Sequence, residues 1–315
     1  YDKLWVATGS KPFVPPMKDI DKVEDKFTFM TWDSAKAIRE KVTAGTKVLI
    51  IGAGLIGLKC AEALHHLNAD ITVVDLADRI LPSILDVRAG EIMQKHIEDK
   101  GTKFILGTSV EQFSKNSAKL TNGETVDFDI LIIAVGVRPN TELVSDAGGK
   151  VEKGIITDLH QQTTIDNVYA AGDCTVSHDC SSNTDRILAL LPNAFMQGEV
   201  AGKNMAGEET LYLNAIPMNA IGFYGLHIIT AGSYDGDEDI TEDADKGIYK
   251  KLVFKDGLLK GFILMGDVAR AGIYTSMIKE QIPLTEVDLD LLRDKPQMMM
   301  FGKARREEKL AGKKH

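Results

Sequence analysis

The sequence predicts an α/β protein joined to a smaller α+β module, and three observations carry this prediction. A run of β-branched and aliphatic residues, Lys47–Ile51, ends in a glycine-rich turn that leads into an apolar-periodic helix. A uniformly apolar run, Asp129–Gly136, is typical of a fully buried strand in a parallel sheet. Beyond Ala215 the pattern changes to closely spaced strands followed by a helix. We expect these later elements at 221–233, 249–255, 258–265 and 269–280.

The glycine-rich turn, residues 52–57, has the spacing Gly-x-Gly-x-x-Gly. Gly52 permits the tight turn, Gly54 lets the backbone approach a pyrophosphate, and Gly57 lets the following helix pack closely on the strand. The N-terminus of that helix, expected over 58–67, offers unpaired N–H groups and a partial positive charge to phosphates. The pattern therefore predicts a dinucleotide-binding unit.

A second apolar run, Ile71–Val74, ends on Asp75, about twenty residues past the glycines, as such a unit requires. A carboxylate at this position accepts hydrogen bonds from a ribose 2′-hydroxyl and repels a 2′-phosphate. The sequence thus predicts NAD(H) rather than NADP(H). Glycine triplets also occur in purely structural turns, but here the flanking strand, helix and acid are all present.

The composition excludes several classes of protein. The chain has 315 residues, of which 44% are hydrophobic and 26% charged, as in ordinary soluble proteins of two or three domains. A formal net charge of −9 argues against non-specific nucleic-acid binding, which needs a basic face. No apolar run approaches the roughly 20 residues of a membrane span, and no signal peptide opens the chain. We expect a cytoplasmic protein that contacts neither nucleic acid nor membrane.

Three cysteines, Cys60, Cys174 and Cys180, form no Cys-x-x-Cys pair and no zinc-type spacing. Their sparse, odd number is typical of a reducing cytoplasm, and we interpret Cys60 and Cys174 as packing residues. His178 and Asp179 next to Cys180 suggest a metal site at first sight. Three adjacent side chains cannot all face one ion without a special turn, so a loop is the preferred interpretation and no metal is predicted.

The remaining chain follows the same patterns. It opens at Tyr1 on a strand, and because a natural N-terminus seldom begins at the edge of a buried strand, we expect that something upstream is missing.

An amphipathic helix runs through Lys41, with Asp33 or Ser34 as its cap. Further helices are expected at 86–100 and 193–206, strands at 104–106, 155–158 and 168–174, and an antiparallel meander at 110–126.

Four further features of the sequence can be interpreted: an acid at a strand end, an acid-rich segment, the charged C-terminal end and the apolar run before it. Asp173 follows directly on a strand, at the sheet edge that faces the ligand crevice in open α/β sheets. Residues 235–245 hold seven acids, which we interpret as a solvated loop rather than a docking patch for a basic partner. The charged end from residue 303 is interpreted as frayed and solvated. Met298–Phe301 packs on the core or on a partner subunit, and the sequence leaves both open.

Four separated segments resemble, in the same order, those of the FAD-dependent pyridine nucleotide–disulfide oxidoreductase superfamily. They are Ala7–Gly9, Gly52–Gly57, Ala134–Asn140 and Thr164–Asp173. The run Gly266–Thr275 looks like the third domain of the NADH:rubredoxin reductase and nitrite reductase flavoprotein branch. This resemblance implies a glutathione-reductase-like fold, with two Rossmann-like dinucleotide-binding domains and a C-terminal α+β domain.

The resemblance also implies a division into domains. The family opens with another Gly-x-Gly-x-x-Gly turn for FAD, and this sequence has none before residue 52. We therefore expect an N-terminally incomplete chain that alone binds FAD weakly or not at all. The implied parts are a remnant of the FAD-binding domain (1–28), the NAD-binding domain (29–147), the second part of the FAD-binding domain (148–213), the C-terminal α+β domain (214–300) and a charged tail (301–315).

The resemblance further implies roles for individual residues. Asp173 would hydrogen-bond the ribityl chain of FAD, and Thr8 and Gly9 would lie near its adenosine-diphosphate portion. Asn193–Ala194 would present a helix N-terminus to the pyrimidine edge of the flavin, which is negatively charged when reduced. No catalytic side chain is predicted, because the cofactors carry the chemistry. The predicted cofactor-binding residues are Thr8, Gly9, Gly52, Gly54, Leu55, Ile56, Gly57, Asp75, Gly136 (bordering the nicotinamide), Gly172, Asp173, Asn193 and Ala194.

The activity implied by the resemblance is hydride transfer from NADH to FAD and onward to an acceptor such as rubredoxin or another small redox protein. Two alternatives stay open. The acceptor is dioxygen, a disulfide or a peroxide, or the chain is a non-catalytic NAD-binding electron-transfer subunit that completes its flavin site with a partner. A homodimer is also left open. Lys59 stands where relatives often carry Glu, which is a departure from the family pattern near the nicotinamide.

Overall fold

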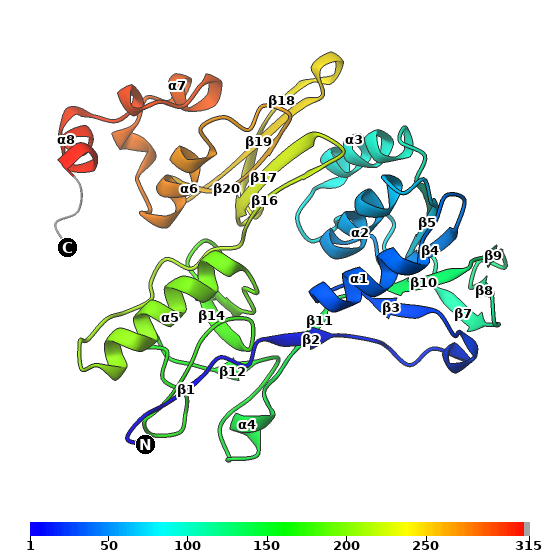
Figure 1. The fold of residues 1–315 in the computed structure, drawn as a ribbon. Coiled ribbons are helices and arrows are strands. Elements are labelled where there is room, and N and C mark those ends of the chain that lie inside the picture. The colour runs from blue at the N-terminus through cyan, green and yellow to red at the C-terminus, as the bar shows by residue number, and fades with distance from the viewer. Residues whose placement is uncertain (312–315) are drawn as a thin grey trace. The chain divides into compact units, whose positions relative to one another are not determined.

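The computed structural model describes residues 1–311, and the chain divides into two compact units (Figure 1). Unit 1 contains Tyr1–Ser10, Pro139–Ile221 and the chain from His227 onward. Unit 2 contains Lys11–Arg138 and the short segment Gly222–Leu226. Each unit has a hydrophobic core of its own.

Unit 2 is built on a five-stranded sheet whose neighbouring strands are all parallel. Its central strands are uniformly apolar and buried along almost their whole length, as the sequence predicts for a parallel sheet. The predicted strand–turn–helix–strand is confirmed, with the helix beginning at Leu55 instead of residue 58. In pairing order the strands are β3 (Lys26–Thr28), β10 (Ile130–Ile133), β4 (Lys47–Ile51), β5 (Asp70–Asp75) and β6 (Lys103–Leu106), and the helices are η1 (Ile20–Lys22), α1 (Trp32–Lys41), α2 (Leu55–His65) and α3 (Val87–Glu98).

The predicted antiparallel meander follows β6 and forms a separate three-stranded sheet. It packs on the parallel sheet through a shared core in which the rings of Phe113 and Phe128 meet edge to face at 6.3 Å. Its strands are β7 (Val110–Phe113), β8 (Ser117–Leu120) and β9 (Thr125–Asp127).

The cap of α1 differs from the expectation. Thr31, rather than Asp33 or Ser34, is the N-cap, and its hydroxyl accepts from the backbone N–H of Ser34 at 3.1 Å. The Ser34 hydroxyl in turn accepts from the Thr31 N–H at 3.1 Å, which completes a capping box. Ser34 is therefore the reciprocal partner in the cap.

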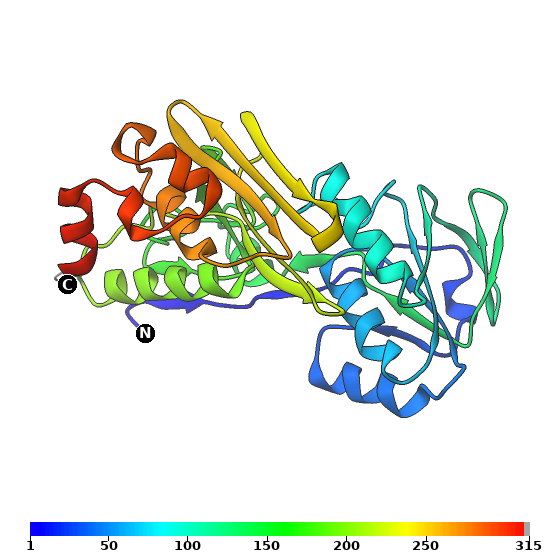
Figure 2. The same cartoon turned by 90° about the horizontal axis from the view of Figure 1, so that it is seen from above.

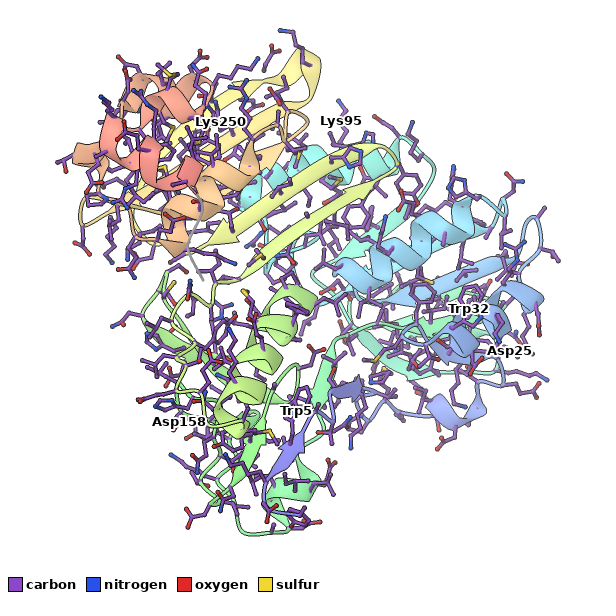
Figure 3. The ribbon with its side chains drawn as sticks, turned by 60° about the vertical axis from the view of Figure 1, so that its left-hand side comes forward. Trp5, Asp25, Trp32, Lys95, Asp158 and Lys250 are labelled. Carbon is purple, nitrogen blue, oxygen red and sulfur yellow. The ribbon has the colours of Figure 1, made fainter. Side chains whose placement is uncertain are left out.

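The first part of unit 1 joins segments that are far apart in the sequence. β1 (Leu4–Val6) pairs in parallel with β13 (Val168–Ala170), and the ring of Trp5 lies 3.2 Å from the position of a Cβ on Gly198 of the neighbouring helix α5 (Figure 3). His178 and Asp179, expected in a loop with Cys180, lie instead at the end of strand β14. The other elements are α4 (Glu142–Ser145), β12 (Ile155–Ile156), β14 (Thr175–Asp179), β15 (Thr184–Arg186) and α5 (Leu191–Met205). β2 (Ser10–Pro12) pairs with β11 (Val137–Pro139), and most of both strands belongs to unit 2.

The second part of unit 1 contains a five-stranded sheet, with α6 lying along one face (Figure 2). The strand expected over 221–233 is two strands that meet at Tyr224–Gly225. The pairing order is β16 (Met218–Phe223), β17 (Leu226–Gly232), β20 (Leu258–Met265), β19 (Ile248–Lys255) and β18 (Asp237–Asp243), and the helices are η2 (Ala244–Lys246), α6 (Ala271–Lys279), η3 (Leu284–Glu286), α7 (Leu289–Asp294), η4 (Met298–Met300) and α8 (Lys303–Ala311).

The acidic segment is the edge strand β18, and the expectation of a loop is wrong. β18 pairs antiparallel with β19, in which Lys250 and Lys251 lie opposite Thr241 and Ile240. Lys251 Nζ lies 2.5 Å from Glu238, and Arg293 Nε lies 2.6 Å from Asp239. These cations offset the repulsion that would otherwise oppose a strand of acids.

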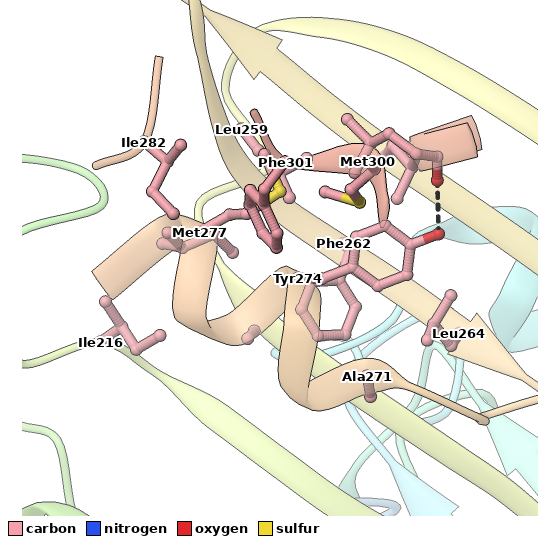
Figure 4. Close-up of a cluster of buried hydrophobic side chains, with 14 of the residues drawn as sticks. Ile216, Leu259, Phe262, Leu264, Ala271, Tyr274, Met277, Ile282, Met300 and Phe301 are labelled. Atoms are coloured by element: carbon pink, nitrogen blue, oxygen red, sulfur yellow. Dashed lines mark hydrogen bonds between the residues drawn. The ribbon is translucent and has the colours of Figure 1, made fainter. Parts of the chain in front are cut away.

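Met300 and Phe301 belong to the core of unit 1, which decides between the two interpretations left open for them (Figure 4). Each is 2% exposed, whereas the neighbouring Met299 is 63% exposed. In the same core the Tyr274 hydroxyl donates to the carbonyl of Leu292 at 2.8 Å. The run thus anchors the chain after α7 to α6 and the sheet.

The charged end is a helix, α8, as far as residue 311, and the expectation of a frayed end is wrong for this part. Arg305 lies 2.8 Å from Glu286, and Lys309 lies 2.9 Å from Glu280, so two ion pairs hold the helix. Residues 312–315 of the expected tail lie outside the described part of the chain. None of the helices in residues 1–311 has the length and apolarity needed to cross a membrane.

The burial of Met300 makes a matched pair of substitutions informative. Met300→Ala is expected to lower the free energy of unfolding by about 2–5 kcal/mol, because it leaves a cavity in the core. Met299→Ala, at the exposed neighbour, is expected to change it by less than about 0.5 kcal/mol. Urea denaturation followed by circular dichroism measures both, and equal effects would contradict the placement of Met300.

Candidate dinucleotide-binding site

The turn between β4 and α2 admits only glycine at two of its positions. A Cβ on Gly57 would lie 2.0 Å from the carbonyl oxygen of Gly52, and a Cβ on Gly52 would lie 2.3 Å from that of Ala134. Gly52 also has a φ of 113°, which side-chain-bearing residues rarely adopt. A Cβ on Gly54, in contrast, would meet no atom within 4 Å. Gly54 therefore borders open space, as close approach of a pyrophosphate requires.

Helix α2 begins directly after Gly54, which is its N-cap and makes no side-chain cap hydrogen bond. The N–H groups of the first helical turn, at Leu55, Ile56 and Gly57, lack intrahelical partners by the geometry of any α-helix. Together with the helix dipole they attract a phosphate at this end. The turn and the first turn of α2 thus fit a dinucleotide pyrophosphate.

Asp75, the last residue of β5, is held beside the glycine turn by backbone hydrogen bonds. Its Oδ2 accepts from the N–H of Ala53 at 2.6 Å, and its Oδ1 accepts from the N–H of Ala77 at 2.8 Å. Each carboxylate oxygen has a second lone-pair direction for a ribose hydroxyl. The carboxylate is therefore oriented before any ligand binds, and its charge opposes a 2′-phosphate.

Gly136 follows β10, the strand next to β4, so it lies at the same edge of the parallel sheet as the glycine turn. A Cβ on it would meet no atom within 4 Å, and its carbonyl accepts from the N–H of Phe13 at 2.9 Å. The guanidinium of Arg138 lies 4.2 Å from the centre of the Phe13 ring. The chain on either side of Gly136 is thereby fixed, while the glycine itself stays uncovered within unit 2.

Lys59 has a role that its sequence position did not reveal. Its ammonium pairs with Glu62 one turn further along α2 and donates to the carbonyl of Gly222 at 2.8 Å. Glu62 Oε1 accepts from the N–H of Tyr224 at 2.6 Å, and the hydroxyls of Tyr224 and Thr102 are 3.3 Å apart. Lys59 thus holds the segment Gly222–Leu226 within unit 2. The sequence around Lys59 did not indicate this role, because the segment that it holds is distant in the sequence.

In unit 1 the residues predicted near FAD form a connected group. The Thr8 hydroxyl donates to the carbonyl of Asn140 at 2.6 Å, and the Asn140 side chain donates back to the carbonyl of Thr8 at 2.9 Å. The Asn140 N–H donates to the carbonyl of Gly9 at 2.9 Å. The hydroxyl of Ser10 then donates to Asp173 at 3.3 Å. Asn140 and Ser10 link Thr8, Gly9 and Asp173, and neither is among the predicted site residues.

Gly172 lies against the first turns of α5. A Cβ on it would be 3.6 Å from that of Ala194, and its N–H donates to Gln197 Oε1 at 2.6 Å. The Gln197 amide also donates to Ser177, so Gln197 ties the end of β13 to β14. Gln197 is buried and was missed, because a glutamine in an amphipathic helix is usually a surface residue.

The side chain of Asn193 is fully buried and bonded within the protein. Its amide donates to the carbonyl of Ile216 at 3.0 Å, and its oxygen accepts from the hydroxyl of Tyr212 at 2.9 Å. Burial raises the pKa of the Tyr212 phenol, which keeps it a donor. Helix α5 begins at Leu191 instead of residue 193, with Pro192 in its first turn. Only the backbone N–H of Asn193 is left to face a ligand.

All three cysteines are buried and free. Burial raises the pKa of the Cys60 thiol to about 12 and also raises the pKa of Cys180. The Cys174 thiol donates to the carbonyl of Ala171 at 3.3 Å. The packing role predicted for Cys60 and Cys174 is confirmed. Across residues 1–311, no three His, Cys, Asp or Glu side chains gather in a way that could hold a metal ion.

Comparison with known proteins identifies the family. Residues 1–198 match the model of the pyridine nucleotide-disulphide oxidoreductases, and residues 217–282 match that of the rubredoxin NAD+ reductase C-terminal domain. The first match covers more than half of the chain, so the chain belongs to the pyridine nucleotide-disulphide oxidoreductase family. The resemblance stated from the sequence is confirmed.

The relatives that match the chain carry different names. The chain is 33% identical over 296 residues to the NADH-dependent phenylglyoxylate dehydrogenase subunit epsilon of Aromatoleum evansii, covering 90% of this chain and 70% of that protein. It is 30% identical over 295 residues to the nitrite reductase [NAD(P)H] of Bacillus subtilis, covering 91% and 36%. It is 39% identical over 220 residues to an NADH oxidase of Methanocaldococcus jannaschii, covering 67% and 48%.

Solved structures confirm the predicted fold class of FAD- and NAD-binding two-domain proteins with a C-terminal domain. An NAD-dependent persulfide reductase from A. fulgidus has a TM-score of 0.81 at 27% identity, covering 91% of this chain and 58% of that one. The water-forming NADH oxidase from Lactobacillus brevis, bound to NADH, has a TM-score of 0.83 at 25% identity, covering 91% and 69%. The chain thus spans between about a third and about 70% of the relatives named here.

The turn geometry predicts opposite outcomes for two glycine substitutions. Gly57→Ala is expected to lower the free energy of unfolding by about 1–3 kcal/mol and to abolish NADH binding, because α2 must move away from β4. Gly54→Ala has room for its methyl group, so stability is retained while NADH affinity falls about tenfold. Thermal unfolding and calorimetric titration with NADH separate the two. A destabilised Gly54→Ala protein would contradict this geometry.

Proposed function

We propose that the protein to which these residues belong is an NADH-dependent flavoprotein oxidoreductase that passes electrons from NADH through FAD to a further acceptor. The observation that carries the proposal is the Asp75 carboxylate, oriented by Ala53 and Ala77 beside a turn that admits only glycine at Gly52 and Gly57. Membership of the family and relatives named as NADH oxidases and NADH-dependent dehydrogenase subunits support it. FAD and NAD(H) are the cofactors.

The residues of unit 2 bind and select the nicotinamide cofactor. The N–H groups of Leu55 and Ile56 hold the pyrophosphate, and Asp75 accepts hydrogen bonds from the adenine ribose. Gly136 borders the nicotinamide. Because Asp75 carries a fixed negative charge, NADPH is disfavoured relative to NADH.

The residues of unit 1 hold part of the flavin site. Asp173 accepts from the ribityl chain, Thr8 and Gly9 lie along the adenosine-diphosphate portion, and the first turn of α5 faces the pyrimidine edge through its N–H groups. Gly172 and Ala194 keep that helix close to Asp173. When bound, FAD and NADH together supply hydride chemistry, so no acid, base or nucleophile from the chain is needed for that step.

A small redox protein is the acceptor class we propose. The match of residues 217–282 to a rubredoxin NAD+ reductase C-terminal domain supports it. Thiol chemistry on the described cysteines is disfavoured, because Cys60, Cys174 and Cys180 are buried and burial raises the pKa of two of them. Dioxygen stays the alternative acceptor, since several relatives are named NADH oxidases.

A second candidate function is an electron-transfer subunit that completes its flavin site with other polypeptide. In the described residues β1 pairs only with β13, although purely parallel sheets are normally larger and covered on both faces. Leu4 and Trp5 of this strand are 40% and 47% exposed. The similar subunit from Aromatoleum evansii also favours this function.

The selectivity for NADH is expected to depend on the charge of Asp75. Asp75→Asn keeps the oxygen that accepts from Ala53 but loses the charge, so NADH affinity falls about tenfold and the preference over NADPH narrows. Asp70→Asn, at the opposite end of β5, is the matched control and leaves both affinities unchanged. Calorimetric titration with each nucleotide measures them. An unchanged preference in Asp75→Asn would overturn the assignment.

Anaerobic mixing of the protein with FAD and NADH distinguishes the two candidate functions. Both functions require NADH to bind in unit 2, whereas only the oxidoreductase needs these residues to hold FAD by themselves. Loss of flavin absorbance on adding NADH supports the oxidoreductase, whereas NADH binding without that loss supports the subunit.

A further inference from the structure

Unit 1 contains a cavity of about 290 Å³ to which the proposed function assigns no role. It is lined by β12, β14, β15, the turns that follow β12, and Tyr212 from the segment after α5, and contains none of the residues proposed to hold FAD or NAD. Its volume is at the lower end of the range of small-molecule sites. The polar lining side chains that matter are Asp158, Gln161, Ser177, His178, Asp185 and Tyr212.

Gln161 is the unusual member of this lining. It is 2% exposed, and its Oε1 is buried without a hydrogen-bond partner in the described chain. Its backbone is fixed, with φ at 64°, its N–H donating to the carbonyl of Asp158 at 3.0 Å and its carbonyl accepting from Ala170 at 2.9 Å. Buried acceptors are almost always satisfied, and the terminal torsion of glutamine turns easily. A turn of the amide about this torsion would bring the oxygen to the cavity, where a donor would satisfy it.

The charged side chains around the cavity indicate which kind of hydrogen-bond donor it would bind. Asp158, labelled in Figure 3, and Asp185 are both exposed carboxylates, and none of the ten lining residues is Lys or Arg. Arg186, next along β15, is directed instead to the buried Asp179 at 3.5 Å. His178 Nδ1 lies 2.9 Å from Asp185, which orients that carboxylate. An amide oxygen and two carboxylates together favour a cation that carries N–H groups.

We propose that this cavity is a binding site for a small organic cation with N–H donors, such as a diamine or a guanidino compound. The cation donates to Gln161 Oε1 and interacts with the carboxylates of Asp158 and Asp185. Ile156, Leu159 and Val176 line the same cavity and pack against an aliphatic spacer. This site is independent of the proposed oxidoreductase function.

The probes are putrescine and agmatine, with butanediol as the neutral analogue of the same length and succinate as the anionic one. Calorimetric titration and saturation-transfer NMR are expected to show saturable binding of the two cations only. Gln161→Met removes the acceptor at similar size and is expected to weaken putrescine binding about tenfold. Gln94→Met, at a half-buried glutamine on α3 of unit 2, is the matched control and leaves binding unchanged.

Asp185→Asn is the second variant, because its exposed side chain leaves the core intact if Gln161→Met fails to fold. It is expected to weaken putrescine binding severalfold, more strongly at low salt than at high salt. Absence of saturable binding by either cation would overturn the proposal. Equal binding of butanediol and putrescine would overturn it as well, since the cavity would then be a hydrated polar space without charge selectivity. Wild-type affinity for putrescine in both variants would also overturn the proposal.

Discussion

The contact on which unit 2 depends is the approach of α2 to the end of β4. The helix starts so close to the strand that a Cβ on Gly57 would lie 2.0 Å from the carbonyl oxygen of Gly52. Gly52 in turn lies against the carbonyl of Ala134, just beyond β10. These two close approaches bring strand, helix and neighbouring strand to one point. As a result, the N-terminus of α2 and the chain leading to Gly136 meet at the same edge of the sheet.

Electrostatics at that edge follow from the backbone. The N–H of Ala53, inside the turn, donates to Asp75 at 2.6 Å and so couples the turn to the acid at the end of β5. Two backbone donors stabilise the carboxylate in one orientation, while the first turn of α2 stays available for phosphate. The fold therefore places the positive first turn of α2 and the negative Asp75 carboxylate before a nucleotide binds. Fewer protein groups then have to become ordered on binding, which lowers its entropic cost.

The parallel sheet and the glycine turn were predictable from the sequence, because uniformly apolar strands and glycine spacing are local signals. Contacts between distant residues were not. Lys59 donates to Gly222, which lies far from it in the sequence. The glycines within 221–233 did not show that the strand breaks at Tyr224–Gly225. The acid-rich sequence of β18 was interpreted as a loop, because the ion pairs that allow it to form a strand, such as that with Lys251, depend on the register of β19. The bonds of the Asn193 side chain to Tyr212 and to the carbonyl of Ile216 were likewise not indicated by its position near the start of a helix.

The most direct measurement of the central claim is a crystal structure of the protein soaked with NADH. We expect the pyrophosphate on the N–H groups of Leu55 and Ile56, and the adenine ribose hydroxyls about 2.7–3.2 Å from the Asp75 carboxylate. The Ala53 N–H would still donate to Asp75 in that complex. Nucleotide bound elsewhere, or a ribose turned away from Asp75, would contradict the account.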